Sequence, residues 1–180
     1  VGYALPSVEV IVTDNGTPVD AGEIGVIEVR GDNVFQGYWN MPEKTAEEMR
    51  DTGFFITGDL GVMSEDGRVS IVGRQKDLII SGGYNIYPKE IEDIINDVDG
   101  VLESAVFGVP HSDFGESVIA TIVVEDKSIT AKDIASIAEP KLARFKHPRE
   151  YIFSDGLPRN TMGKVQKNVL RENYGQAFSD

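Results

Sequence analysis

Residues 73–92 read GRQKDLIISGGYNIYPKEIE, and the hydrophobic pattern of the chain changes within this stretch. We expect a strand to end at Arg74, because polar residues follow it directly. Pro88 then stands at the position of a first helical residue, and Gly100 is placed to end the same helix. Apolar residues recur between them at helical spacing, at Ile91, Ile94, Ile95 and Val98. The stretch therefore predicts a boundary between two domains.

The part of the chain before this boundary alternates apolar and polar residues in short runs, which is typical of β-strands. We predict strands at residues 8–12, 25–30, 54–56 and 69–72, and a short helix at residues 42–50. A small β-rich unit of this kind favours a distorted barrel.

The part after the boundary mixes both kinds of element. We predict strands at residues 105–109, 118–124 and 151–153, and helices beginning at Pro88, at residues 131–143 and after Gly163. The predicted fold class is therefore α+β. We place one domain at residues 1–76 and the other at residues 77–180, with a hinge at residues 74–78.

The composition limits the possible functions. The 180 residues are 41% hydrophobic, enough to bury a core, and no apolar run is long enough to form a membrane-spanning helix. The chain has no cysteine, which suits a reducing compartment, and we expect a cytoplasmic protein. Its two histidines, His111 and His147, lie far apart in sequence, so we expect no metal site. Because the chain begins at Val1 without methionine, we expect it to be part of a longer protein.

The charge is unevenly distributed. A net charge of −13 opposes binding to nucleic acid or to an anionic membrane. Residues 141–171 nevertheless carry eight basic side chains against two acidic ones. The eight are Lys141, Arg144, Lys146, Arg149, Arg159, Lys164, Lys167 and Arg171. Two interpretations stay open, a solvated basic face or a compact site for a small anion such as a nucleotide or a carboxylate.

Several catalytic signatures are missing from the sequence. There is no G-x-S-x-G turn of the kind that presents a serine nucleophile. Gly163 and Lys164 do not form a P-loop, because Val165 stands where that motif needs Ser or Thr. Gly82 and Gly83 lack the spacing of a dinucleotide-binding loop. The sequence therefore favours none of these chemistries.

Three segments carry the functional information: residues 54–60 (FFITGDL), residues 73–92, and residues 157–164 (LPRNTMGK). In this order and spacing they resemble the adenylate-forming superfamily of acyl-CoA synthetases, peptide-synthetase adenylation domains and luciferases. The resemblance extends over essentially the whole chain. It implies that ATP and a carboxylate form an acyl-AMP, which then reacts with CoA. It also implies that residues 1–76 end a large N-terminal domain and that residues 77–180 form a mobile lid.

The resemblance assigns roles to individual residues. Asp59 matches an aspartate that accepts both ribose hydroxyls of ATP, and Arg74 matches an arginine that reaches the same nucleotide. Lys76 falls on the hinge position, about which the lid rotates between the two half-reactions. Lys164 matches the lysine that enters the site for adenylation, between the substrate carboxylate and the α-phosphate. The plainer alternatives are a turn for Asp59, a surface ion pair for Arg74 and an ordinary loop position for Lys164.

For CoA, the resemblance implies two groups of residues. The first group is Ser81, Gly82 and Gly83. Its glycines let the backbone approach the pantetheine arm once the lid has rotated. The second group is Phe145, Lys146 and Arg149. It places an aromatic ring against adenine and the basic side chains on phosphate, although His147 stands where some relatives have Arg. A partly buried Phe145 that closes the preceding helix is the competing explanation.

Within the superfamily, residues 35–45, 113–116 and 158–168 look closest to malonyl-CoA synthetases. We therefore expect part of an AMP-forming acid–thiol ligase, with malonate as the leading substrate and little or no activity in this chain alone. Magnesium is expected to accompany ATP, with its ligands in the N-terminal region that this sequence lacks. A protein acetyltransferase acting on Lys164 is an expected partner. Two alternatives stay open: an adenylation domain that loads a carrier protein, and a non-catalytic module that retains the fold.

Overall fold

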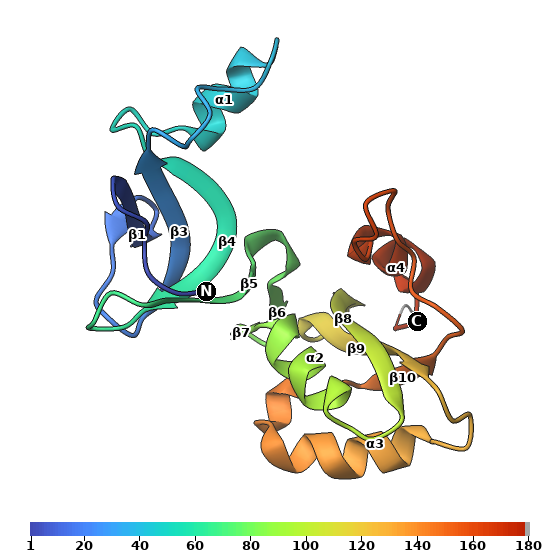
Figure 1. The fold of residues 1–180 in the computed structure, drawn as a ribbon. Coiled ribbons are helices and arrows are strands. Elements are labelled where there is room, and N and C mark those ends of the chain that lie inside the picture. The colour runs from blue at the N-terminus through green and yellow to red at the C-terminus, as the bar shows by residue number, and fades with distance from the viewer. Residues whose placement is uncertain (179–180) are drawn as a thin grey trace. The chain divides into compact units, whose positions relative to one another are not determined.

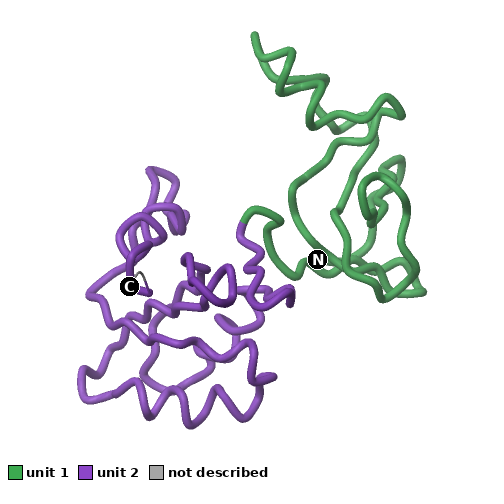
Figure 2. Tube along the Cα trace, turned by 180° about the vertical axis from the view of Figure 1, so that it is seen from behind, with its two compact units in different colours: residues 1–76 green, residues 77–180 purple. Residues whose placement is uncertain are grey.

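The computed structural model describes residues 1–178. The chain divides into two compact units, Val1–Lys76 and Asp77–Asp180, which Figure 2 draws in different colours. Each unit has its own sheet and its own buried apolar residues.

The first unit is built on an antiparallel five-stranded sheet (Figure 1). Its strands are β1 (Val8–Asp14), β2 (Thr17–Pro18), β3 (Ile24–Gly31), β4 (Phe55–Met63) and β5 (Val69–Arg74), in the order β2-β1-β3-β4-β5. Helix α1 (Pro42–Glu48) lies in the connection from β3 to β4 and has no buried residue. The buried cluster of this unit, Val12, Ile27 and Val69, comes from the strands alone.

The sheet of the first unit is open, so the expected distorted barrel is wrong. β2 and β5 stand at the two ends of the strand order, and no pairing joins them within residues 1–178. β2 spans only two residues and ends at Pro18, which has no backbone N–H to donate. A barrel closes only when both edge strands can pair along their length, and β2 is too short to do so.

Strand β4 continues beyond the expected strand at residues 54–56. The segment from Thr57 to Asp59 belongs to this strand, although only Asp59 has a paired residue, Arg74 of β5. Gly58 adopts a φ of 71° within it, a conformation that glycine tolerates without strain. The register with β5 shifts between Leu60 and Gly61. Because this irregularity breaks the regular alternation of side chains, the full length of the strand could not be predicted from the sequence pattern.

The helix expected at residues 42–50 ends earlier, at Glu48. Met49 has an extended backbone, with φ of −116° and ψ of 121°, and forms an isolated bridge with Phe55. The chain therefore turns back toward the sheet one residue after the helix.

The second unit has the predicted α+β composition. Its strands are β6 (Ile79–Ser81), β7 (Tyr84–Ile86), β8 (Val101–His111), β9 (Gly115–Val124) and β10 (Glu150–Phe153). The sheet has the order β10-β9-β6-β7, and β8 also pairs with β9. β8 and β9 form a long antiparallel hairpin, whereas β10 runs parallel to β9.

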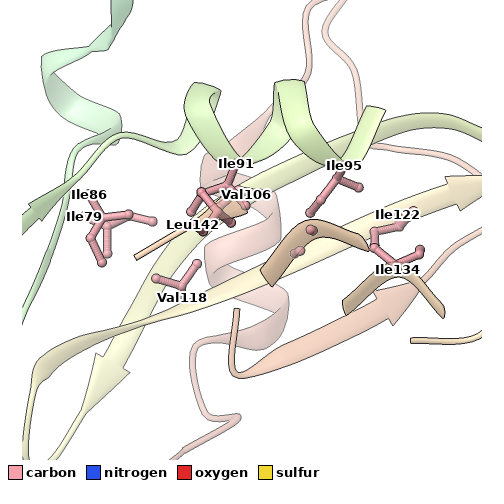
Figure 3. Packing of buried hydrophobic residues seen from close by; sticks show 11 residues of the cluster. Ile79, Ile86, Ile91, Ile95, Val106, Val118, Ile122, Ile134 and Leu142 are labelled. Carbon is pink, nitrogen blue, oxygen red and sulfur yellow. The ribbon is translucent and has the colours of Figure 1, made fainter. Parts of the chain in front are cut away.

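Alternate residues of the β8–β9 hairpin enter two separate apolar clusters. One cluster joins Val106, Val118 and Ile122 to helices α2 (Pro88–Asn96) and α3 (Ala131–Ala138), as Figure 3 shows. The other joins Phe107 and Ile119 to helix α4 (Lys167–Tyr174) through Leu170. Because side chains alternate across a strand, both faces of the hairpin are covered. This explains its nearly continuous apolar sequence.

The helix expected at residues 131–143 is shorter, because α3 ends at Ala138. Thr130 and Asp133 form a capping box at its start. Pro140 has no N–H for an α-helical hydrogen bond, so the α-helix does not continue through it. The chain continues as one short 3-10 turn at Glu139–Lys141 and another at Arg144–Lys146.

The sequence analysis missed strands β6 and β7. They form a small hairpin within the stretch from which the domain boundary was predicted. Gly82 and Gly83 make its turn, with φ of 57° and 83°, and each tolerates this left-handed region. Three-residue strands are too short to show a reliable alternation, so only the Gly-Gly pair signalled the turn.

Two isoleucines of α3 offer a matched test of the second unit's core. Ile134 is fully buried, whereas Ile137 on the same helix is 43% exposed. We expect Ile134→Ala to lower the free energy of unfolding by about 2 to 4 kcal/mol, because it leaves a cavity. We expect Ile137→Ala to lower it by less than about 0.5 kcal/mol. Urea denaturation followed by far-ultraviolet circular dichroism measures both, and equal losses would contradict this packing.

Candidate functional site

A hollow of about 780 Å³ lies in the first unit, where the end of β5 meets β4. Three of the predicted site residues line it, namely Asp59, Arg74 and Lys76. Thr57 and Gly58 of β4 complete this part of the wall. The structure therefore brings the two residues predicted for the nucleotide and the predicted hinge residue to one hollow.

Asp59 and Arg74 are direct partners across the β4–β5 ladder. The Arg74 Nε lies 2.7 Å from Asp59 Oδ1 in an ion pair, and the Arg74 Nη1 donates to the Thr57 carbonyl at 3.3 Å. The Thr57 hydroxyl donates to the Ile27 carbonyl at 2.7 Å and accepts from the Asp59 N–H at 3.1 Å. The Asp59 side chain keeps a quarter of its surface exposed. A carboxylate that is fixed by an ion pair and partly exposed can accept hydrogen bonds from the hydroxyl groups of a ligand.

Helix α1 adds a second wall that the sequence analysis missed. Tyr38, Lys44 and Glu48 line the same hollow. The Tyr38 hydroxyl donates to Glu48, and the Lys44 Nζ lies 3.5 Å from the Glu48 carboxylate. The Tyr38 hydrogen bond, followed by the Lys44 charge, holds the pKa of Glu48 below its ordinary value. The i, i+4 spacing of Lys44 and Glu48 was the one signal in the sequence that could have linked them.

Lys76 lies at the end of this unit, in a single 3-10 turn at Gln75–Asp77. Its side chain is exposed. It therefore lies in the connection between β5 and β6.

A second hollow, of about 410 Å³, lies in the second unit between the β6–β7 turn and the segment after α3. Four of the six residues predicted for CoA line it, namely Ser81, Gly82, Phe145 and Arg149. Gly83 belongs to the same turn as Gly82 but does not line the hollow. Lys146 points elsewhere, because its Nζ is 2.7 Å from both Glu90 carboxylate oxygens.

Aromatic rings form much of this second hollow. Tyr84 stacks on Phe145 with ring centroids 4.5 Å apart and an angle of 21° between the planes. The Arg149 guanidinium lies 4.5 Å from the centroid of Phe114. Phe145 is 41% exposed in its own 3-10 turn, so the alternative that it closes the preceding helix is wrong. The hollow can stack a flat ring and place a cation beside it.

Ser117 of β9 is a further residue that the sequence analysis missed. It is 1% exposed, it lines the second hollow, and its hydroxyl has no partner among the described residues. A buried hydroxyl without a partner is unusual, because such a group loses its hydrogen bonds to water. Nothing in the local sequence distinguishes this serine from a core residue of the strand.

Lys164 is exposed at the end of a tight loop in the second unit. Arg159 and Val165 form an isolated bridge at the base of this loop. Asn160 Oδ1 accepts from the Lys164 N–H at 2.9 Å, and the Asn160 N–H donates to the Lys164 carbonyl at the same distance. Gly163 has a φ of 78°, which allows the turn directly before the lysine. The backbone of Lys164 is therefore fixed while its side chain is free to reach outward.

Residues 1–178 contain no cluster of three or more His, Cys, Asp or Glu side chains suited to a metal ion. None of their helices has the length and apolar character needed to cross a membrane.

The sequence matches a known family and known proteins. Residues 90–164 match the family model of the AMP-binding enzyme C-terminal domain. The chain is 44% identical over 172 residues to an octahydro-indenyl-propanoyl:CoA ligase of Rhodococcus jostii (strain RHA1), covering 95% of this chain and 32% of that protein. It thus spans about a third of the length of that relative.

Solved structures give the same correspondence. The ATP-bound structure of MatB from Rhodopseudomonas palustris is 56% identical, with a TM-score of 0.94 over 99% of this chain and 36% of that one. The apo structure of the same protein is 58% identical over the same shares, with a TM-score of 0.69. The amide bond synthetase McbA from Marinactinospora thermotolerans is 34% identical, with a TM-score of 0.89 over 97% of this chain and 35% of that one. The chain is therefore similar to the C-terminal portion of the adenylate-forming, AMP-binding enzymes.

Proposed function

We propose that the chain is part of an ATP-dependent acyl-CoA synthetase. In the first half-reaction a carboxylate attacks the α-phosphorus of ATP, forming acyl-AMP and releasing pyrophosphate. In the second, the CoA thiolate attacks the acyl carbon, forming acyl-CoA and releasing AMP. The observation that carries the proposal is the Asp59–Arg74 pair at 2.7 Å in the first hollow, within a chain 44% identical to a CoA ligase.

Asp59 and Arg74 are proposed to bind ATP. An ionised carboxylate has acceptor sites for two adjacent ribose hydroxyls, and Arg74 already fixes one of its oxygens. Arg74 is half exposed, so part of its guanidinium remains open to the nucleotide. Donors fixed in place before binding cost little further ordering. The hollow is large enough to admit a nucleotide, which supports this assignment.

Lys164 is proposed to be the catalytic lysine of adenylation. Its ammonium would offset the negative charge that develops as the carboxylate attacks and pyrophosphate departs. The fixed loop backbone supports this role, because a charge held in position before reaction needs less reorganisation. Acetylation by a protein acetyltransferase would remove this charge and stop the first half-reaction.

Lys76 is proposed to be the hinge between residues 1–76 and 77–180, with the second unit acting as a mobile lid. A hinge residue has to change its backbone dihedrals, and an exposed side chain in a one-turn helix does so without breaking a core. The two MatB structures support the idea of a change in this region. They match this chain with TM-scores of 0.94 and 0.69 at nearly equal identity, so they differ from each other here.

The second hollow is proposed to hold the nucleotide end of CoA. Phe145 offers a ring for adenine and Arg149 a cation for phosphate, and the glycine turn leaves room for the pantetheine arm. Lys146 would take part only by leaving its ion pair with Glu90. The fold itself does not specify the acceptor, because the amide bond synthetase McbA has it too. CoA is favoured here by the identity to a CoA ligase.

Malonate is proposed as the acid, from the resemblance to malonyl-CoA synthetases and the 56% identity to MatB, which belongs to that group. Magnesium is proposed to accompany ATP as its counter-ion and, as the resemblance implies, to be held by residues outside this chain.

The first test uses the full-length enzyme that contains this chain. Pyrophosphate release is measured with ATP, magnesium and a panel of malonate, methylmalonate, acetate, a long-chain acid and benzoate, each with and without CoA. We expect release with malonate, sustained turnover only with CoA, and a fall of roughly 100- to 1000-fold in Lys164→Ala.

The other outcomes separate the remaining hypotheses. Turnover with a different acid would retain the mechanism and reject malonate. Turnover that needs a carrier protein instead of CoA would identify a carrier-loading adenylation domain. No release with any acid would contradict the proposed enzyme.

A second test addresses the CoA hollow by comparing Arg149→Met with Lys141→Met. Arg149 lines the hollow, whereas Lys141 is an exposed cation of the same segment that does not. We expect Arg149→Met to raise the KM for CoA about tenfold, since one charge-assisted contact is lost, and to leave adenylation without CoA unchanged. Steady-state kinetics at varied CoA would reject this placement if the two variants behaved alike.

A further inference from the structure

The loop that carries Lys164 is followed by two basic residues whose side chains already form ion pairs. Lys167 and Arg171 lie one turn apart on α4. The Lys167 Nζ is 2.6 Å from Glu92 Oε1 on α2, and the Arg171 Nη2 is 2.8 Å from Asp77 Oδ1. These two basic side chains therefore attach α4 to two distant segments of the second unit.

The other side of the same loop is attached as well. Arg159 forms an ion pair with Glu103 of β8. Its Nη1 also donates to the Gly163 carbonyl at 2.6 Å, directly before Lys164. The loop is thus held at its start by β8 and, beyond its end, by α2 and Asp77.

The burial of the two ion pairs on α4 distinguishes them from ordinary surface contacts. Lys167 and Glu92 are each 17% exposed, and Asp77 is 16% exposed. The Lys127–Asp155 pair of the same unit, by contrast, has side chains that are 83% and 92% exposed. Exposed pairs contribute little, whereas removing one partner of a desolvated pair leaves a charge without compensation. The pairs on α4 can therefore hold a position that a solvated pair cannot.

We propose that Arg159, Lys167 and Arg171 are positioning residues that clamp the Lys164 loop to the body of the second unit. The inference rests on the proposed function, because a clamp matters to catalysis only if Lys164 acts in adenylation. Asp77 directly follows the proposed hinge residue Lys76, so Arg171 ties the lysine-bearing segment to the first residue beyond the hinge. A rotation at the hinge then carries the loop with the lid as one rigid body.

The chemical reason for such a clamp is precision of placement. Lys164 has to meet a carboxylate and an α-phosphate that other parts of the enzyme bind. A displacement of about 1 Å at a reacting group can cost up to roughly 100-fold in rate. The clamp should matter for the half-reaction in which Lys164 takes part. It should matter little for thioester formation, in which Lys164 has no proposed role.

The experiment measures the two half-reactions separately in the full-length enzyme. Adenylation is measured by ATP–pyrophosphate exchange with the accepted acid, and thioester formation by the reaction of synthetic acyl-AMP with CoA. The variants are Lys167→Met and Arg171→Met, which remove a cation and keep an apolar stem. Lys127→Met is the matched control, because it breaks an ion pair of the same unit outside both hollows. Lys167→Arg is the conservative variant, and Lys164→Ala reports on the catalytic lysine.

We expect Lys167→Met and Arg171→Met to lower the kcat of adenylation roughly 10- to 100-fold, with the KM for ATP and the thioester rate within about threefold of wild type. Lys167→Arg should retain most of the rate, and Lys127→Met should retain all of it. This split, in variants whose far-ultraviolet circular dichroism shows them to be folded, supports the clamp.

Other results overturn it in distinguishable ways. If both half-reactions fall together, or if the conservative variant fails as badly as Lys167→Met, the pairs only stabilise the fold. If Lys164→Ala loses adenylation while the clamp variants keep it, the clamp is rejected and the proposed function stands. If Lys164→Ala itself keeps adenylation, the proposed role of the lysine fails, and the clamp fails with it.

Discussion

The second unit depends on burying the β8–β9 hairpin on both faces. Alternate side chains of these strands pack against α2 and α3 on one side and α4 on the other. A strand pair covered in this way cannot shift its register by one residue, because every side chain would change clusters. Burial of this apolar surface at about 25 cal/mol per Å² is the main favourable contribution to folding. The hairpin therefore sets the positions of the elements at its ends, including those that carry the candidate site.

The functional segments are attached to this framework but lie outside it. The second hollow forms near the Gly115 end of β9, where Ser81 of β6 pairs with Gly115 and the Gly82 N–H donates to the Phe114 carbonyl at 2.9 Å. The Lys164 loop lies between β10 and α4 and is tied to β8 through Arg159. Turns and loops can present backbone and charge in ways that a buried strand cannot. The rigid hairpin provides stability, and the irregular segments at its edges can extend side chains and backbone groups toward a ligand, as the proposed chemistry requires.

Much of this organisation was predictable from the sequence, and what was not has identifiable causes. The periodicity from Pro88 to Val98 predicted α2, because a long amphipathic pattern carries a strong signal. The barrel was wrong because sheet closure depends on the edge strand β2, whose two residues give almost no pattern. Tyr84 and Ser117 were missed because their importance comes from neighbours far away in sequence. Motif resemblance found Asp59 and Arg74 as separate residues, whereas their direct pairing required the register of β4 and β5.

The basic side chains at residues 141–171 fall into different groups once their contacts are known. Neither a uniform solvated face nor a single anion site describes them. Four of these cations are paired with carboxylates: Lys146, Arg159, Lys167 and Arg171. Arg144 and Arg149 instead line the second hollow, and Lys164 stands exposed on its loop. Under the proposed function, the paired cations fix the lid and the remaining ones meet negative charge on ligands. Asp59, the proposed nucleotide ligand, belongs to one unit and Lys164 to the other. Under the proposed function, adenylation therefore requires the two units to be brought together, and a lysine carried by the rotation has to be held on a rigid segment.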